Sequence, residues 1–530
     1  MKPLRSLLPL LPLLLVGCSP ADPFDHAYDQ ISAEGLAAQI KVLASDDFGG
    51  RAPASPGEEK TLDYLEQELR ALGFEPGNGN SFRQPVMLHS VTPAPADLFI
   101  DDERYAHGQE QVAISHQFTD HITLSDAELV FVGYGINAPE LNWNDYAGLD
   151  VKGKVVVVLV NDPDFENPAS QQFGGKAMTY YGRWTYKYEE AARQGAAGAL
   201  IVHEDEPASY GWNVVMNGRK GPQLGRPRLP TEPLLQIEGW LTRAAAERLF
   251  EQARQNFADL KARAMQGPTA LPLGLTASIS IQNELATTVS SNLVATLPGR
   301  ERPEERIIYS AHWDHLGTKD GLIYNGALDN ASGTAGLLQI ARAFASLPER
   351  PARSVTLIAT TAEEQGLIGS DHYAAEPLYP LAKTVAVFNM DSLNVLGRVK
   401  ELTVVGLGKS QAEDYLARAA ERQGRVLAAE SRPERGGYFR SDHFPFALKG
   451  VPAVYAGGGV TPVDERTAKY RALMEKHVSN CYHEPCDKFR DDWDLSGAVE
   501  DLQLLFDAGY QLVTSNDWPQ WSATAEFKRP

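Results

Sequence analysis

The sequence predicts an α/β protein with a doubly wound, mostly parallel sheet and a second, β-rich region inserted into it. First, strand and helix patterns alternate from residue 291 to 515, which is typical of a parallel sheet covered by helices on both faces. Second, residues 126–270 have a different sequence pattern, in which short apolar strands flank one helix. Third, 530 residues are too many for one ordinary hydrophobic core.

The first 17 residues have the pattern of a bacterial lipoprotein signal peptide. Lys2 and Arg5 precede the apolar run LLPLLPLLLV, which has signal-peptide length and is too short to span a membrane. The tetrapeptide LVGC that ends at Cys18 resembles the lipobox, which implies cleavage before Cys18 and its lipidation. An ordinary cleaved signal is the alternative. No aspartate follows Cys18, so the resemblance implies the outer membrane as the site of anchoring, facing the periplasm or the exterior.

Only two cysteines remain if Cys18 is lipidated. Cys481 and Cys486 lie five residues apart, and an oxidising compartment favours a local disulfide over two free thiols. The formal net charge of −20 argues against a nucleic-acid partner, because phosphate binding needs clustered Lys and Arg. Composition does not give the oligomeric state.

Residues 27–125 are predicted to form a helical N-terminal part of the main domain, followed by connecting strands. Residues 31–45 and 56–74 carry apolar residues at helical spacing, with Pro56 at the start of the second helix. The loop SDDFGGRAPAS between them is rich in Gly and Pro. From residue 84 to 125 the pattern is short and strand-like.

Residues 126–270 are predicted to be an inserted domain. FVGYGI and KGKVVVVLVND are strand patterns, and KYEEAARQGAAGALIVHED is a helix that leads through Gly into another strand. The order and spacing of FVGYGI, NDYAGLDVKGKVVVVL and AARQGAAGALIV resemble the protease-associated domain. That resemblance implies a β-rich insert without catalysis of its own.

Residues 285–515 carry the alternation that predicts the main sheet. The predicted strands include RIIYSAHWDH, SVTLIATTAEE, TVAVFNMDSLN, ELTVVGLG and GVPAVYAGGG, and the predicted helices are ASGTAGLLQIARAFASL, QAEDYLARAAERQG and SGAVEDLQLLFDAGYQLV. In open α/β sheets, binding sites gather at the carboxyl ends of the strands. The residues at these ends are therefore the first candidates for function.

Carboxylates and histidines stand at several of these strand ends. His312 and Asp314 follow RIIYSA, Glu363 and Glu364 follow VTLIAT, and Asp391 follows VAVFNM. Taken singly, such a histidine is usually packed, and two acidic residues at a strand end are usually solvated. Together they would repel one another, with raised pKa values, and no basic cluster lies nearby in the sequence. A divalent metal removes that conflict, and histidine with carboxylate and no thiolate suits catalytic zinc.

Two further candidates lie outside the strand ends. Asp329, in NGALDNASG, immediately precedes a helix, where an N-cap is the ordinary alternative to a metal ligand. His483 lies in a late loop, CYHEPCD.

Five motifs in this order resemble the co-catalytic di-zinc metallopeptidase family of bacterial leucyl aminopeptidases and aminopeptidase Y. They are SAHWDHLG, GALDNASGTAGLLQIAR, TTAEEQGLIGS, FNMDS and YHEPCD. Glutamate carboxypeptidase II and glutaminyl cyclase are more distant members. The resemblance covers residues 291–515 with the helical segment 31–75, about half the chain.

The resemblance implies two Zn²⁺ ions per chain. His312 and Asp391 match the ligands of one zinc, and Glu364 and His483 match those of the other. Asp329 matches the carboxylate that bridges both ions.

The resemblance also implies the catalytic roles. Glu363 matches the general base, which moves protons between water and the leaving amine. Asp314 would orient the imidazole of His312, and Tyr482 matches a position whose hydroxyl stabilises the oxyanion in some relatives. Neighbouring residues in a strand point to opposite faces, so Glu363 and Glu364 can hold different roles.

The family resemblance predicts an aminopeptidase acting on peptides. An acidic site favours a free N-terminus, whereas a carboxypeptidase needs arginine near the site. Arg440 lies in GYFRSDHFPF, which resembles the pocket loop of the family, and either binds a carboxylate or pairs with Asp442. His315 and His443 are assigned to packing or to support of the ligands. The alternatives are a carboxypeptidase, dipeptidase or cyclase of the same fold, or a binding protein that has lost catalysis.

Overall fold

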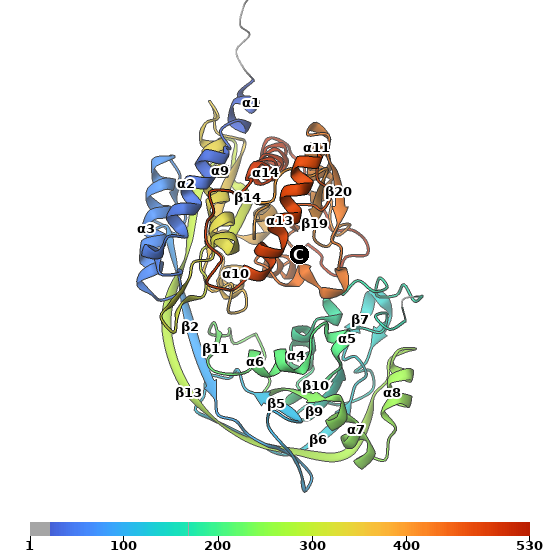
Figure 1. Cartoon of the computed structure of the whole chain (residues 1–530). Helices are drawn as coiled ribbons and strands as arrows, with labels where there is room; N and C mark the ends of the chain where they lie inside the picture. Colours follow the sequence, from blue (N-terminus) through green and yellow to red (C-terminus); the bar gives the residue numbers. More distant parts are fainter. Residues whose placement is uncertain (1–21, 168, 530) are drawn as a thin grey trace, which may run out of the picture.

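The computed structural model describes residues 22–167 and 169–529, which form a larger α/β region and a smaller region beneath it (Figure 1). The predicted signal peptide and Cys18 lie outside the described residues. In the part of the chain that is described, no helix has the length and apolar character needed to cross a membrane.

The sheet of the larger region confirms the predicted fold class. Its strands lie in the order β21 (Ala453–Tyr455), β18 (Thr384–Asn389), β14 (Arg302–His312), β17 (Arg353–Thr360) and β13 (Leu271–Leu297). The first four are parallel, and β13 runs antiparallel to β17. Parallel neighbours need crossover connections, and helices supply them here. The carboxyl ends of β14, β17 and β18 therefore meet at one edge.

Helices cover both faces of this sheet. Alternate residues of β14 divide between them: Ile307 and Tyr309 belong to the core on one face, and Ile308 belongs to the core on the other. The first face is covered by α2 (Ala33–Leu43), α3 (Pro56–Ala71), α9 (Gly333–Ala345), α11 (Ala412–Arg422) and α14 (Ser496–Thr514). The second carries the shorter α10 (Ile368–Ala375) and α12 (Phe444–Leu448).

The smaller region has its own mixed sheet. From β13 the order continues through β6 (His121–Phe131), β9 (Val155–Leu159), β10 (Gly198–His203), β12 (Ile237–Thr242) and β5 (Gln111–Ile114). Helices α4 (Trp184–Arg193) and α7 (Arg243–Gln252) pack on it. β3 (Leu98–Ile100) and β5, which we assigned from sequence to the N-terminal segment, join this sheet because their partners come much later in the chain.

Strand β13 connects the two regions. Residues 271–282 pair with β6, residues 283–293 pair with β2 (Arg83–Pro93), and residues 293–297 pair with β17. The middle part forms a ribbon with β2 along one side of the molecule, and β11 (Gln223–Gly225) pairs with part of β2 (Figure 1). The sequence did not predict this continuity, because residues 284–289 are exposed on both faces and show no alternation of buried and exposed positions.

Two elements near the C-terminus also differ from expectation. β19 (Glu401–Val404) pairs with β20 (Val426–Ala429) in a separate two-stranded sheet. A long helix, α13 (Glu465–Cys481), was not predicted, because most of its residues are exposed and only four are buried. It ends directly before the segment that contains His483.

Candidate metal centre

The edge where the parallel strands end brings the predicted residues together. β14 ends at His312, which is 1 % exposed. β17 ends at Thr360, three residues before Glu363, and β18 ends at Asn389, two residues before Asp391. Residues distant in sequence thus meet because neighbouring parallel strands end side by side.

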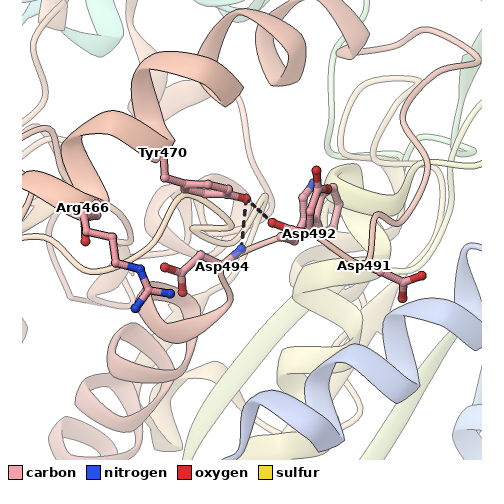
Figure 2. A pocket seen from close by; sticks show the side chains of 7 residues that line it. Arg466, Tyr470, Asp491, Asp492 and Asp494 are labelled. Atoms are coloured by element: carbon pink, nitrogen blue, oxygen red, sulfur yellow. Dashed lines mark hydrogen bonds between the residues drawn. The ribbon is translucent and has the colours of Figure 1, made fainter.

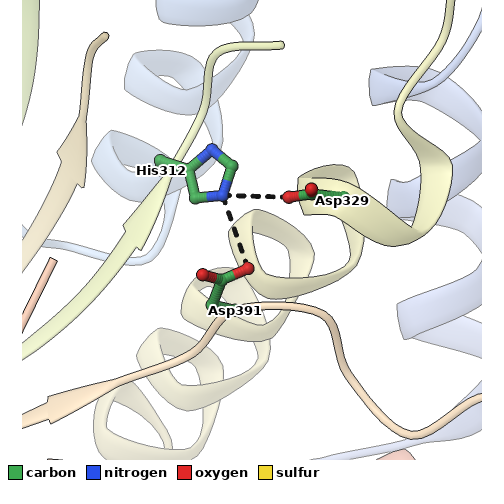
Figure 3. Close-up of side chains that lie close together, drawn as sticks. All are labelled: His312, Asp329 and Asp391. Atoms are coloured by element: carbon green, nitrogen blue, oxygen red, sulfur yellow. Dashed lines mark ion pairs between the residues drawn. The ribbon is translucent and has the colours of Figure 1, made fainter. Parts of the chain in front are cut away.

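The carboxylate of Asp329 lies between two histidines. Its Oδ1 is 3.1 Å from Nε2 of His312, and its Oδ2 is 2.9 Å from Nε2 of His483. The same nitrogen of His312 is 3.5 Å from Oδ1 of Asp391. Figure 3 shows the imidazole of His312 facing both carboxylates. Each oxygen of Asp329 therefore belongs to a different half of the site.

Glu364 completes the second half. Its Oε2 is 3.1 Å from Nε2 of His483, and its Oε1 is 2.6 Å from Nδ1 of His315. Two groups can hold an ion, since their donor atoms lie within 4.8 Å of one another: His312, Asp329 and Asp391, and His315, Asp329 and Glu364. They share Asp329.

The donor atoms of this site fit zinc. They are imidazole nitrogens and carboxylate oxygens, which Zn²⁺ accepts in catalytic sites. Nε2 of His312 is buried and makes no hydrogen bond of ordinary geometry, although carboxylate oxygens surround it. A nitrogen so placed is suited to share a cation with those oxygens.

The pKa values of the carboxylates in the site also favour a bound cation. Burial raises the pKa of Glu363 well above its usual range, and nearby Asp391 and Asp442 raise it further, while His312 opposes them. Burial likewise raises the pKa of Asp314 to about 8. The protein side chains alone leave these carboxylates insufficiently compensated, and a divalent cation would relieve the repulsion.

Glu364 and His483 form an ionised pair. Burial raises the pKa of Glu364, but hydrogen bonds from His315 and His483 outweigh it and hold that pKa at about 2. Burial lowers the pKa of His483, yet hydrogen bonds to Asp329 and Glu364 raise it to about 10. A metal bound here would replace the proton on His483.

The loop that carries Asp329 is fixed from two sides. Oδ1 of Asn330 accepts from the backbone N–H of Gly333, the first residue of α9, at 2.9 Å, and Ser332 occupies the N-cap position of that helix. The alternative reading of Asp329 as the N-cap is therefore wrong, because its carboxylate faces the two histidines. The carboxylate of Asp487 accepts from the N–H groups of Leu328 and Asp329 at 3.0 and 3.2 Å.

His483 lies in a segment closed by a disulfide. Cys481 and Cys486 are joined by the bond that the sequence favoured. Asp487 directly follows Cys486, so this stretch of chain both presents His483 and holds the loop of Asp329.

Arg51 links two of the loops that carry site residues. This buried guanidinium donates to the carbonyl oxygens of Leu43, Trp313, Asn325 and Gly326 at 2.6–2.9 Å. Trp313 follows His312 directly, and Gly326 lies three residues before Asp329. Arg51 was not among the predicted residues, and its only signal in the sequence is its place in a Gly- and Pro-rich loop between two helices.

Asp314 supports the site differently from our expectation. Its carboxylate is 3.8 Å from Nδ1 of His312, which is too long for a hydrogen bond. The backbone carbonyl of Asp314 makes that contact instead, at 3.1 Å. The carboxylate is turned to accept the backbone N–H of Glu363, also at 3.1 Å. Asp314 thus orients the Glu363 loop.

Two contacts to Asp391 were not predicted from the sequence. Ser441 donates its hydroxyl to Oδ2 of Asp391 at 2.7 Å, and Tyr455 donates to the backbone carbonyl of Asp391 at 3.0 Å. Tyr455 is the last residue of β21. The signal that could have found it was a tyrosine at the end of a fourth parallel strand.

Tyr482 and Arg440 lie at the margin of the candidate metal centre. The side chain of Tyr482 is 55 % exposed, and its ring stacks on His483 with centroids 4.0 Å apart. Arg440 is exposed. Asp442 is buried, and its carboxylate accepts hydrogen bonds from the hydroxyl groups of Thr360 and Ser370. These two hydroxyl groups hold Asp442, rather than the predicted ion pair with Arg440. His443 is buried among aromatic rings, as expected of a packed residue.

A separate hollow lies at the other end of α13 (Figure 2). It is lined by Arg466, Thr467, Tyr470, Asp491, Asp492, Trp493 and Asp494. Helix α13 has 17 residues and so is about 25 Å long, and the hollow lies at its beginning whereas His483 follows its end. The hydroxyl of Tyr470 donates to the backbone carbonyl of Asp492 and accepts from the backbone N–H of Asp494, which connects the lining of the hollow. This hollow is not part of the candidate centre.

Comparison with known proteins gives partial matches. The mouse Aminopeptidase NAALADL1 is 36 % identical over 127 residues, which are 23 % of this chain and 16 % of that protein. The Probable glutamate carboxypeptidase AMP1 of Arabidopsis thaliana is 30 % identical over 230 residues, 38 % of this chain and 31 % of that protein. The chain thus matches less than a third of either relative's length.

The structural comparison spans more of the chain. The solved aminopeptidase from Aneurinibacillus sp. strain AM-1 is 22 % identical with a TM-score of 0.49, over 92 % of this chain and 95 % of that one. The model of Peptidase family M28 matches residues 292–506. These residues contain β14, β17 and β18 with every residue of the two metal groups. Residues 292–506, less than half of the chain, are thus similar to peptidase family M28.

Proposed function

We propose that the chain is a zinc exopeptidase with two zinc ions, most specifically an aminopeptidase that hydrolyses N-terminal residues of peptides. One observation carries this proposal: two histidine–carboxylate groups share Asp329, with Glu363 beside them. His312 and Asp391 would hold one zinc, and Glu364 and His483 the other. When bound, zinc supplies Lewis acidity, which polarises a peptide carbonyl and lowers the pKa of water.

Glu363 is the proposed general base. Its Oε2 lies 4.0 Å from Nε2 of His312, farther than the carboxylate oxygens of Asp329 and Asp391. It is therefore placed beside the proposed ligands rather than among them. From there it can accept a proton from an attacking water and give one to the leaving amine. Asp314 holds its backbone N–H and so keeps Glu363 near the site.

The smaller region is proposed to be a protease-associated insert that shapes the substrate cleft. This proposal rests on the sequence resemblance and on contacts with the pocket loop. The ring of Tyr180, just before α4, lies 5.5 Å from the ring of Phe444 and 6.1 Å from that of Phe439. The insert therefore packs directly against the loop that carries Arg440.

We propose aminopeptidase specificity because the site is rich in carboxylates. A free, positively charged N-terminus is attracted to such a site, and a C-terminal carboxylate is repelled. The exposed Arg440 is the feature that favours the second candidate, a carboxypeptidase, because its guanidinium is the only group of the predicted pocket loop suited to grip a carboxylate.

Acetylation of the substrate N-terminus tests this choice. We expect the acetylated peptide to be cleaved with roughly 100-fold lower kcat/KM than the free peptide, because a hydrogen bond to a charged group contributes about 1.5–3 kcal/mol. A C-terminally amidated peptide is the control and should be cleaved like the free peptide. Undiminished cleavage of the acetylated peptide, with loss on amidation, would favour the carboxypeptidase.

We also propose that Cys18 anchors the protein to the outer membrane through lipid. Cys18→Ser is expected to move the protein from the membrane to the soluble fraction, because membrane attachment would then lack its acyl chains. Incorporation of labelled palmitate, followed in wild type and variant, provides the measurement. Label in both proteins, or in neither, would contradict lipidation at Cys18.

A further inference from the structure

We propose that His315 is a positioning residue that fixes the orientation of Glu364 in the metal centre. This inference rests on the proposed zinc centre and goes beyond it, since no role was assigned to His315 beyond packing or general support. It concerns one carboxylate, of which one oxygen would be held by the protein and the other left for the metal.

The contact is direct and buried. Nδ1 of His315 lies 2.6 Å from Oε1 of Glu364, and His315 is fully buried. The other carboxylate oxygen, Oε2, lies 3.1 Å from Nε2 of His483. His315 therefore occupies one side of the carboxylate and turns the other side toward His483 and Asp329. A short contact of a carboxylate with a nitrogen donor is among the stronger hydrogen bonds.

The geometry selects the protonated nitrogen of His315. Its Nε2 is buried and has no hydrogen-bond partner among the described residues. With the proton on Nδ1, the ring donates to Glu364 and leaves a lone pair at Nε2. With the proton only on Nε2, a buried donor would be unpaired, and the lone pair of Nδ1 would face a carboxylate oxygen. His315 is therefore a donor through Nδ1.

The ring of His315 has little room to turn. A Cβ added at Gly326 would lie 2.5 Å from its Cγ and 2.6 Å from its Cδ2, so the imidazole packs directly on that glycine. The backbone N–H of His315 donates to the carbonyl of Arg51 at 3.2 Å. Arg51 in turn donates to the carbonyl of Gly326 at 2.8 Å. The backbone and the ring of His315 are thus held by the same cluster.

A direct ligand role for His315 is the competing reading, because its nitrogen lies close enough to Asp329 and Glu364 to share an ion with them. The 2.6 Å contact argues for positioning. Nδ1 already faces Glu364 at hydrogen-bond length and would have to give up that bond to bind a metal. A carboxylate ligand held by a neighbouring donor is a common means of setting ligand direction.

Three substitutions separate the two readings. His315→Asn places an amide N–H near the position of Nδ1, His315→Gln extends its amide beyond it, and His315→Ala removes the donor. His203→Ala is the matched control, because it deletes another buried imidazole, one whose Nε2 is 3.1 Å from the carbonyl of Tyr210 in the smaller region. Each metal-free protein is titrated with Zn²⁺ against a competing chelator, and its melting temperature is recorded without metal.

We expect His315→Ala and His315→Gln to bind one of two zincs about 10–100-fold more weakly than wild type, as for other residues that support ligands. His315→Asn and His203→Ala should retain both affinities. Wild-type zinc affinity in His315→Ala would overturn the inference. An Asn variant as weak as the Ala variant would overturn it too, because the imidazole itself would then be the ligand. A wild type that binds no zinc would instead refute the proposed function.

Discussion

Glu363→Gln is expected to slow peptide hydrolysis by roughly 10²–10⁴-fold while the protein still binds two zincs. The amide keeps the size of the side chain but cannot accept the proton of an attacking water. A positioned general base contributes roughly 10²–10⁴-fold to rate, so kcat should fall by about that factor. Steady-state kinetics on a peptide with a free N-terminus, together with metal analysis of the same preparation, measures both quantities.

A solvent-facing glutamate provides the control for this experiment. Glu376, at the end of α10, has a side chain 56 % exposed, and Glu376→Gln should leave kcat and zinc content unchanged. Retained activity in Glu363→Gln would show that another group is the base. Loss of zinc from Glu363→Gln would show that Glu363 is a ligand, and the roles of Glu363 and Glu364 would have to be exchanged.

Asp329→Ala is expected to weaken binding of both zincs, in contrast with every other single ligand substitution. The two oxygens of Asp329 face different histidines, His312 at 3.1 Å and His483 at 2.9 Å. Removal of that carboxylate takes a ligand from each half at once. We expect the zinc content after dialysis to fall clearly below about one ion per chain, since metal affinity depends on the full set of deprotonated ligands.

Asp391→Ala is the matched comparison, because the carboxylate of Asp391 pairs with His312 and not with His483. It should weaken one zinc and leave the other, so that about one ion per chain remains. Hydrolysis should be lost in both variants. Equal zinc content in Asp329→Ala and Asp391→Ala, with one high-affinity site left in each, would contradict the bridging position of Asp329. Circular dichroism of both metal-free proteins checks that the fold persists.

The sequence allowed much of the main sheet to be predicted. Apolar strands with period-two or continuous burial, alternating with amphipathic helices, have a strong local signal. That is why β14, β17 and β18, and the charged residues after each, could be placed at one edge. The assignment of Glu363 as the general base and of Glu364 as a zinc ligand did not follow from this pattern. It came from the family resemblance.

Other features had only a weak signal in the sequence. Helix α13 packs few buried residues, so its apolar residues form no continuous stripe. Strand β13 passes from one sheet to another through a part exposed on both faces, where alternation is lost. In both cases the element is stabilised by neighbours that are distant in the chain.

The fold class, the strand ends and the chemical type of the site could be predicted without a structure, because they depend on periodicity and on residue identity. Tertiary structure alone decided which atoms face one another. It put Asp329 beside His483 across 154 positions of sequence and left the N-cap of α9 to Ser332. It also brought Arg51 to the carbonyl of Gly326 and His315 to the carboxylate of Glu364. Such contacts depend on the packing of separate loops, and no local pattern in the sequence records that packing.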